Sequence, residues 1–362
     1  MRRQRLAQLL HAPIDWPLLI ATASAHGILP LCCERIAGDE ICIPADVATR
    51  LREENRRHSM RSLLLMSELF RINEALVRRK IPIMSYKGPT LAQLAYGGPL
   101  LRGFADVDMV VEQKFMPQIS EVMTALGYES KLSGESFVAR GRQIPGEYAF
   151  VHKTHQALVE FHTEFTLRHF PRRPRMNEMA KRSVLICING REIATFSLAD
   201  NLLMLCVHGA KDFWSRLIWA SDICAVAKEL QAADWQELLA FAQEYDAARM
   251  IRLALALADS LFSVQIPPEI REGVAGDCMA LRTAATISKS LLQGGDFPAG
   301  VIARSRYRIA MVPGWRGVGY WVRLATAPTE EDWRNSRASH SGARPRHWFR
   351  DPARLWQKKE PA

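Results

Sequence analysis

The stretch RGFADVDMVV, residues 102–111, places two aspartates, Asp106 and Asp108, inside an otherwise apolar run. Its apolar, valine-containing half predicts a β-strand that begins near Asp106. Residues two apart in a strand project from the same face, so both carboxylates share one face while Val107 and Met109 point toward the core. Two carboxylates this close raise each other's proton affinity, which a neighbouring cation or a divalent metal would relieve.

The spacing alone does not separate a metal site from a solvent-facing aspartate pair. A later stretch, LVEFH at residues 158–162, alternates cleanly and places Glu160 and His162 on one face of a second strand. A third carboxylate on a neighbouring strand would complete a pocket able to hold two metal ions roughly 3.5–4 Å apart. His162 could instead have a purely structural role, with its ring hydrogen-bonded to a backbone carbonyl.

A candidate anion-binding turn precedes the aspartates. The stretch YKGPT, residues 86–90, follows a short apolar strand predicted over 81–87. It opens a predicted helix with Gly88 as N-cap and Gly97 as its end. Backbone amides at a helix N-terminus bind anions, and a glycine lets a phosphate approach closely. Lys87 adds a cation at the same turn, although it could equally be a surface lysine.

The order of helical and strand patterns along the chain predicts an α+β protein, with a small mixed β-sheet flanked by helical segments. Helical periodicity dominates the beginning of the sequence, gives way to strand patterns at Ile81 and resumes at Leu198. Two further strands are predicted as a hairpin, SFVARGR and EYAFVHK, around Pro145 and Gly146. The predicted parts are an N-terminal helical segment (1–80), an α/β core (81–197), a helical domain (198–300) and a basic, partly irregular C-terminal segment (301–362).

Bulk properties narrow the class of protein. The 362 residues are 48% hydrophobic and carry a formal net charge of +10, which favours anionic partners without choosing among them. The longest apolar stretches are broken by proline and histidine, so no transmembrane segment is expected. The seven cysteines form no CxxC pair, which argues against a zinc site or a disulfide framework and for a reducing cytoplasm. Nucleic acid is not expected as a partner, because the C-terminal tryptophans and arginines are irregularly spaced.

The stretch YKGPTLAQLAYGGPLLRGFADVDMVV, residues 86–111, resembles the signature of a family of bacterial nucleotidyltransferases whose reactions are largely uncharacterised. The resemblance covers roughly residues 15–330. It includes VEFHTEF, similar to the family's third acidic strand, and SLADNLLMLCVHGAKDFWSRLIWASDICAV, similar to its helical segment. The nucleotidyltransferase superfamily has a small mixed sheet flanked by helices, which agrees with the predicted fold.

The resemblance implies a set of site residues and a reaction. The catalytic, metal-binding carboxylates would be Asp106, Asp108 and Glu160. The nucleotide-binding residues would be Lys87, Gly88, Thr90 and Arg102, with His162, His208 and Lys211 as further candidates. The cofactor would be Mg²⁺ or Mn²⁺. A nucleoside triphosphate, with ATP expected, would transfer its nucleoside monophosphate to a hydroxyl of an unidentified small molecule, peptide or protein, releasing pyrophosphate.

One departure from the wider superfamily makes binding of the triphosphate at the turn less certain to follow the superfamily's pattern. The superfamily has Gly-Ser at the turn, where this sequence has Lys-Gly-Pro-Thr and no serine. Two alternatives therefore stay open. A D-x-D glycosyltransferase would use the aspartates to hold a nucleotide sugar, although a larger nucleotide-binding domain would usually precede the motif. A non-catalytic relative would bind a nucleotide or a partner, although it would have little reason to keep three carboxylates.

Overall fold

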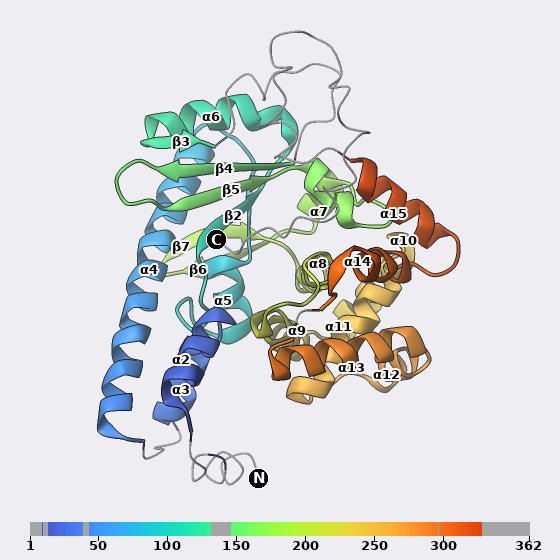
Figure 1. Cartoon of the computed structure of the whole chain (residues 1–362). Coiled ribbons are helices and arrows are strands. Elements are labelled where there is room, and N and C mark those ends of the chain that lie inside the picture. The colour runs from blue at the N-terminus through green and yellow to red at the C-terminus, as the bar shows by residue number, and fades with distance from the viewer. Residues whose placement is uncertain (1–8, 10–13, 39–42, 132–145, 296, 328–362) are drawn as a thin grey trace.

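The computed structural model describes residue 9 and residues 14–38, 43–131, 146–295 and 297–327. A single sheet lies at the centre, with a long helix along one side and a group of helices on the other (Figure 1). The sheet has the strand order β3-β4-β5-β2-β1-β7-β6. Its strands are β1 (Met84–Tyr86), β2 (Asp106–Val110), β3 (Tyr128–Ser130), β4 (Glu147–His152), β5 (Leu158–His162), β6 (Val184–Ile188) and β7 (Arg191–Thr195).

The sheet is mixed. Strand β2 runs parallel to β5 and β1 runs parallel to β7, while the other neighbouring pairs are antiparallel. The predicted α+β class, with a small mixed sheet flanked by helices, is therefore confirmed.

One face of the sheet packs against helices from the first third of the chain. These helices are α4 (Ala45–Arg78), the 3-10 helix η1 (Gln113–Phe115) and α6 (Met116–Ala125). Helices α2 (Trp16–Ala25) and α3 (Leu29–Gly38) form a separate apolar cluster with the first part of α4. The long α4 buries an apolar stripe, Leu65, Leu69, Ile72 and Leu76, whose spacing matches the helical period. Val107 and Met109 of β2 join this layer. The apolar side of β2 is thus turned to α4, as predicted.

The opposite face of the sheet is turned toward the C-terminal helices. Met84 and Tyr86 of β1 and Val110 of β2 belong to the same buried cluster as α8 and its neighbours. The helices on this side are η3 (Glu164–His169), α7 (Met176–Lys181), α8 (Leu198–Lys211), α9 (Leu217–Glu229), α10 (Ala232–Glu244), α11 (Ala248–Phe262), α12 (Pro268–Ala275), α13 (Cys278–Gln293), α14 (Gly300–Ala310) and α15 (Arg316–Thr326). Since Asp106 and Asp108 have the same parity as Val110, their side chains meet this helical layer.

Helix α5 (Gly88–Tyr96) begins one residue earlier than predicted. Lys87, and not Gly88, is the N-cap residue, while Gly97 ends the helix in the left-handed conformation as expected. Lys87 and Gly88 both have positive φ, 58° and 45°. A lysine in that conformation is strained. The turn therefore leaves β1 on a sharply bent path next to β2.

The structure adds elements that the sequence did not reveal, and some predicted segments lie outside the described residues. The hairpin β6–β7 was not predicted, although Asn189 and Gly190 mark its turn. The C-terminal segment from residue 301 was predicted to be basic and partly irregular, and its described part contains most of α14 and all of α15, up to Thr326. The predicted strand SFVARGR at residues 136–142 lies outside the described residues, as do residues 328–362. Among the described helices, none combines the length and the apolar character that crossing a bilayer requires.

Candidate active site

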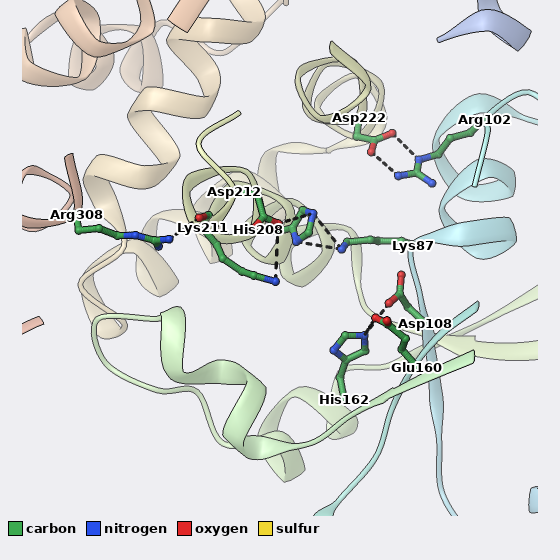
Figure 2. A network of polar contacts seen from close by, with 10 residues as sticks. All are labelled: Lys87, Arg102, Asp108, Glu160, His162, His208, Lys211, Asp212, Asp222 and Arg308. Atoms are coloured by element: carbon green, nitrogen blue, oxygen red, sulfur yellow. Dashed lines mark hydrogen bonds and ion pairs between the residues drawn. The ribbon is translucent and has the colours of Figure 1, made fainter. Parts of the chain in front are cut away.

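The acidic residues come together because β2 and β5 are neighbouring parallel strands. Their register pairs Asp108 with Glu160 and Val110 with His162. Residues paired across a ladder project from the same face, so Asp108, Glu160 and His162 line the face turned toward the C-terminal helices (Figure 2). Asp106 lies two residues before Asp108 and shares that face. The prediction that the two acidic strands are neighbours is confirmed.

Three of these side chains converge on a common point. Asp108, Glu160 and His162 each offer a ligand atom, and the three atoms lie within 4.8 Å of one another. His162 Nε2 lies 2.6 Å from Asp108 Oδ1 and 3.8 Å from Glu160 Oε2. Adjacent ligands of an octahedral ion bound at about 2.1 Å are roughly 3 Å apart, a value within this range. The donor set thus fits a divalent metal, and Asp106 could add a further oxygen.

The site is electrostatically strained without a bound cation. Burial, followed by the charge of Asp108, raises the pKa of Asp106 to about 6. Burial and the nearby charges of Glu147 and Asp108 raise the pKa of Glu160 to about 7. The pKa of Asp108 is lowered, because Lys87 and the hydrogen bond from His162 outweigh its burial. Protons are thus held on two carboxylates where a metal would otherwise offset the charge.

His162 relieves part of this strain in the metal-free protein. It is buried, and its hydrogen bond to Asp108 raises its pKa against the opposing effect of burial. The edge of Tyr86 packs against the imidazole, with ring centroids 6.2 Å apart. The histidine is therefore held beside Asp108 by a carboxylate, and not by the backbone carbonyl that was its alternative partner.

The turn after β1 brings a cation toward the acidic strands. Lys87 Nζ lies 3.1 Å from Nδ1 and 3.3 Å from Nε2 of His208, which comes from α8 (Figure 2). The ammonium also lies 4.6 Å from the ring centroid of Tyr86. Its charge lowers the pKa of both Asp106 and Asp108. Gly88 lies beside the backbone of Asp106, since a Cβ built on it would be 3.8 Å from the Asp106 carbonyl oxygen.

Thr90 stabilises this turn from inside. Its side chain is completely buried, and its hydroxyl donates to the Lys87 carbonyl oxygen at 2.8 Å. The hydroxyl of Ser85 lies 3.2 Å away. The Thr90 hydroxyl thus stabilises the backbone of the turn at Lys87 and Gly88. It does not contact the acidic side chains of β2 and β5 through this hydrogen bond.

Helix α8 contributes a second group of charges near its C-terminus. His208 Nε2 lies 3.5 Å from Asp212 Oδ2, and Lys211 Nζ lies 3.8 Å from the same oxygen. Burial and the charge of Lys87 hold the pKa of His208 well below its usual range, so the imidazole is neutral. The pKa of Lys211 is raised, because the carboxylates of Asp212 and Glu147 outweigh its burial.

Arg102 connects the sheet to the helical layer. Its guanidinium forms a bidentate ion pair with Asp222 of α9, with both N–O distances at 2.8 Å. Both side chains are buried, and Asp222 also accepts a hydrogen bond from Tyr96 at 2.8 Å. The paired carboxylate raises the pKa of Arg102 despite its burial. This ion pair holds Arg102 between α9 and the loop before β2, and the charge of Arg102 also lowers the pKa of Asp106.

The site therefore has an acidic side and a basic side that face each other. Strands β2 and β5 carry the carboxylates, and the turn before α5 together with α8 carries Lys87, His208 and Lys211 (Figure 2). Such an arrangement can bind a divalent metal on one side and phosphate oxygens on the other. A family model described as an uncharacterised nucleotidyltransferase matches residues 12–263. The chain belongs to this family.

Other comparisons add little to the nucleotidyltransferase assignment. A search of curated proteins found no match. One similar solved structure is the crystal structure of an antigenic nucleotidyltransferase-like protein from Paracoccidioides brasiliensis. It is 15% identical, with a TM-score of 0.31, and the match covers 54% of this chain and 91% of that chain. That similarity is too low to support a further conclusion about this chain.

The sequence did not reveal two of the charged residues near the site. Glu147 lies opposite His162 in the β4–β5 register and so projects from the same face as Glu160. In EYAFVHK, Glu147 and Ala149 alternate with the buried Tyr148 and Phe150, which was a usable signal once β4 was placed next to β5. Asp212 follows α8 and contacts His208, but no local pattern distinguishes it from an ordinary helix-end aspartate.

Proposed function

We propose that the chain transfers a nucleoside monophosphate from a nucleoside triphosphate to an acceptor hydroxyl and releases pyrophosphate. ATP is the donor we would test first. The observation that carries the proposal is the pairing of Asp108 with Glu160 on neighbouring parallel strands, facing the cationic turn at Lys87. Membership of the nucleotidyltransferase family supports the general reaction. The departure from the usual Gly-Ser turn makes the residues around Lys87 the part most in need of a test.

In this proposal Asp106, Asp108 and Glu160 hold Mg²⁺ or Mn²⁺. His162 either adds a nitrogen ligand or keeps Asp108 oriented, since its Nε2 lies 2.6 Å from the carboxylate. A divalent ion bound there would lower the pKa of the acceptor hydroxyl and offset the charge of the phosphates. The carboxylates supply the negative charge that makes such binding favourable, and their high pKa values mean that bound protons leave when the ion arrives.

The bond changes balance without a further reactant. The acceptor oxygen attacks the α-phosphorus, the bond from that phosphorus to the bridging oxygen breaks, and pyrophosphate leaves with the electron pair. Glu160 or an aspartate accepts the hydroxyl proton. Lys87 and the backbone at Gly88 would stabilise the charge that develops on the leaving phosphates.

Thr90 and Arg102 take supporting roles in this proposal. The Thr90 hydroxyl is bound to the Lys87 carbonyl oxygen, so it would shape the phosphate turn without touching the ligand. Arg102 is paired with Asp222, so it would fix α9 against the loop that leads into β2. We therefore predict that both residues affect nucleotide binding indirectly, by holding the turn and the helix in place.

The test is a transfer assay with the full chain. The protein is incubated with Mg²⁺ or Mn²⁺, each α-labelled nucleoside triphosphate and a panel of hydroxyl acceptors, and pyrophosphate and labelled acceptor are measured. We expect the double variant Asp106→Asn/Asp108→Asn to lose activity by about 100-fold or more, because it removes the metal-binding charge. Asp259→Asn on α11, where the exposed carboxylate pairs only loosely with Arg271 at 3.7 Å, is the matched control.

Two outcomes would contradict the proposal. Wild-type rates in the double aspartate variant would exclude a role for the pair in the reaction. Transfer from a nucleotide sugar, with none from any triphosphate, would replace nucleotidyl transfer by glycosyl transfer.

A further inference from the structure

Helix α15 presents an apolar stripe to solvent at the outer edge of the helical layer (Figure 1). Trp315, which caps the helix, is 83% exposed, and Val318 and Val322 are 49% and 44% exposed. These three residues are three and four positions apart, so they share one face of the helix. The solvent face of a surface helix normally carries polar residues. We call these three residues the apolar stripe.

The opposite face of α15 is packed tightly, so the stripe is held outward. Gly317 and Tyr320 are buried on that face. A Cβ on Gly317 would lie 2.6 Å from the Val312 carbonyl oxygen, which leaves no room for a side chain where α15 meets the chain leaving α14. The Tyr320 hydroxyl donates to the His169 carbonyl oxygen at 2.9 Å. The helix therefore has a fixed orientation, with its apolar stripe turned away from the protein.

Arginines border the stripe along one flank of α15. Arg316 and Arg323 are seven residues apart, so they project from the same flank, about a third of a turn from the stripe. Arg323 donates to backbone carbonyl oxygens within residues 168–171. The loop that continues from there therefore lies beside α15, and its arginines are exposed. We call the five residues the arginine border: Arg172, Arg173, Arg175, Arg316 and Arg323.

The arginine border carries more positive charge than its neighbours offset. Asp246 lies 2.9 Å from Arg316 and 3.8 Å from Arg172. Among the described residues, no other carboxylate forms an ion pair with a member of the border. Partial burial and the charge of Arg173 lower the pKa of Arg323, so these two guanidinium groups act on each other. Like charges gathered in this way favour an anionic partner.

We propose that the apolar stripe and the arginine border form a docking surface for a membrane that contains anionic lipid head groups. Guanidinium groups bind phosphate oxygens through paired N–H donors. An exposed tryptophan and a basic, amphipathic helix are typical of surfaces that lie in the interface between head groups and acyl chains. The net charge of +10 attracts the whole chain to the same kind of surface. The inference does not depend on the proposed reaction.

The combination of the two features favours a lipid surface over other partners. A nucleic acid would use the arginines, but its bases stack on aromatic rings and would leave Val318 and Val322 without a role. A second copy of the chain would cover the valines, but a two-fold interface would bring two arginine borders together and like charges would repel. A bilayer with anionic head groups satisfies the apolar stripe and the border together.

The test is vesicle flotation with the full chain at low salt. The probe vesicles are pure phosphatidylcholine, or an equimolar mixture of phosphatidylcholine and phosphatidylglycerol. We expect the wild type to bind the mixed vesicles more tightly than the neutral ones. Val318→Gln/Val322→Gln should weaken binding by about fivefold or more, because the variant buries less apolar area. Met60→Gln/Leu63→Gln on α4, where the residues are 59% and 45% exposed, should stay within about twofold.

The role of the arginine border has its own matched pair of variants. Arg173→Gln/Arg175→Gln should weaken binding to the mixed vesicles by about tenfold, because both charges lie at the docking surface. Arg50→Gln/Arg56→Gln on α4 removes the same charge from exposed positions elsewhere and should weaken binding by less than about threefold. Thermal melting shows whether each variant is folded.

Four outcomes would overturn the proposal. The first is no vesicle binding by the wild type, whether a second copy or residues 328–362 cover the stripe. The second is equal vesicle binding by the wild type and the valine variant. The third is equal affinity of the wild type for neutral and mixed vesicles. The last is binding of a single-stranded oligonucleotide that needs Arg173 and Arg175, in a chain that does not float with vesicles.

Discussion

At the scale of single residues, Asp106 and Glu160 make the metal-free protein sensitive to pH. Their pKa values in the folded state are about 6 and about 7, mainly because of burial, against about 4 in an unfolded chain. The folded state therefore holds protons that the unfolded state releases, so the free energy of unfolding falls as pH rises from about 4 to about 7. His162, whose pKa is also raised, acts in the same direction above pH 6.5.

We expect the contribution of these two carboxylates to the free energy of unfolding, measured by urea denaturation in a chelator, to fall by on the order of 2 kcal/mol between pH 5 and pH 8. His208, whose pKa is lowered by burial, contributes in the opposite direction below pH 6.5, so the comparison is made between the wild type and a variant of the two carboxylates. Millimolar Mg²⁺ or Mn²⁺ should recover part of the loss at pH 8, because a ligand that binds only the folded state stabilises it. In the double variant Asp106→Asn/Glu160→Gln, the free energy of unfolding should fall less between pH 5 and pH 8 than in the wild type. A decrease of the same size in that variant would show that other groups are responsible.

The residues of the site differ in how far the sequence could reveal them. The aspartate pair, Glu160 and the Lys-Gly turn each belong to a local pattern, so strand periodicity and turn chemistry identified them. The contact between Lys87 and His208 spans 121 residues, and it depends on how α8 packs over the sheet. A partner that distant is fixed by tertiary packing, which no local spacing encodes.

At the scale of elements, the glycine that follows His208 determines how α8 ends. A Cβ on Gly209 would lie 2.6 Å from the ring of Trp214, which is completely buried. Gly209→Ala should therefore lower the free energy of unfolding by about 1–3 kcal/mol through overpacking. Gly319→Ala on α15 is the control, because that position is open and alanine favours a helix by roughly 1 kcal/mol. A stability of Gly209→Ala at or above that of the wild type would contradict the packing argument.

The strand pairings show which elements a sequence specifies. Strands β2 and β5 carried clean alternation and were predicted at nearly their observed positions. The hairpin β6–β7 was missed, although Asn189 and Gly190 take positive φ of 49° and 76°, as a tight hairpin turn requires. The strand β1 was predicted from Ile81, yet only Met84–Tyr86 is extended in the sheet. Its ends are set by pairing with β2 and β7, which the sequence of β1 does not contain.

At the scale of the whole molecule, the site is assembled from two layers. The sheet supplies the carboxylates and Lys87, and the helical layer supplies His208 and Lys211, while the buried pair of Arg102 and Asp222 holds the layers together. Composition and periodicity were enough to predict a small mixed sheet between helical segments. They could not predict which helix covers the acidic face, because α8, α9 and α11 are all rich in buried apolar residues.

The central claim is that the acidic face of β2 and β5 and the cationic end of α8 bind the two halves of one metal–triphosphate complex. The most direct measurement is a crystal structure of the full chain with Mn²⁺ and a triphosphate whose bond between the α- and β-phosphates cannot be hydrolysed, using manganese anomalous scattering. We predict manganese beside Asp108 and Glu160, with the terminal phosphates against Lys87, His208 and Lys211. Manganese absent from those carboxylates, or a triphosphate bound away from Lys87, would contradict the account.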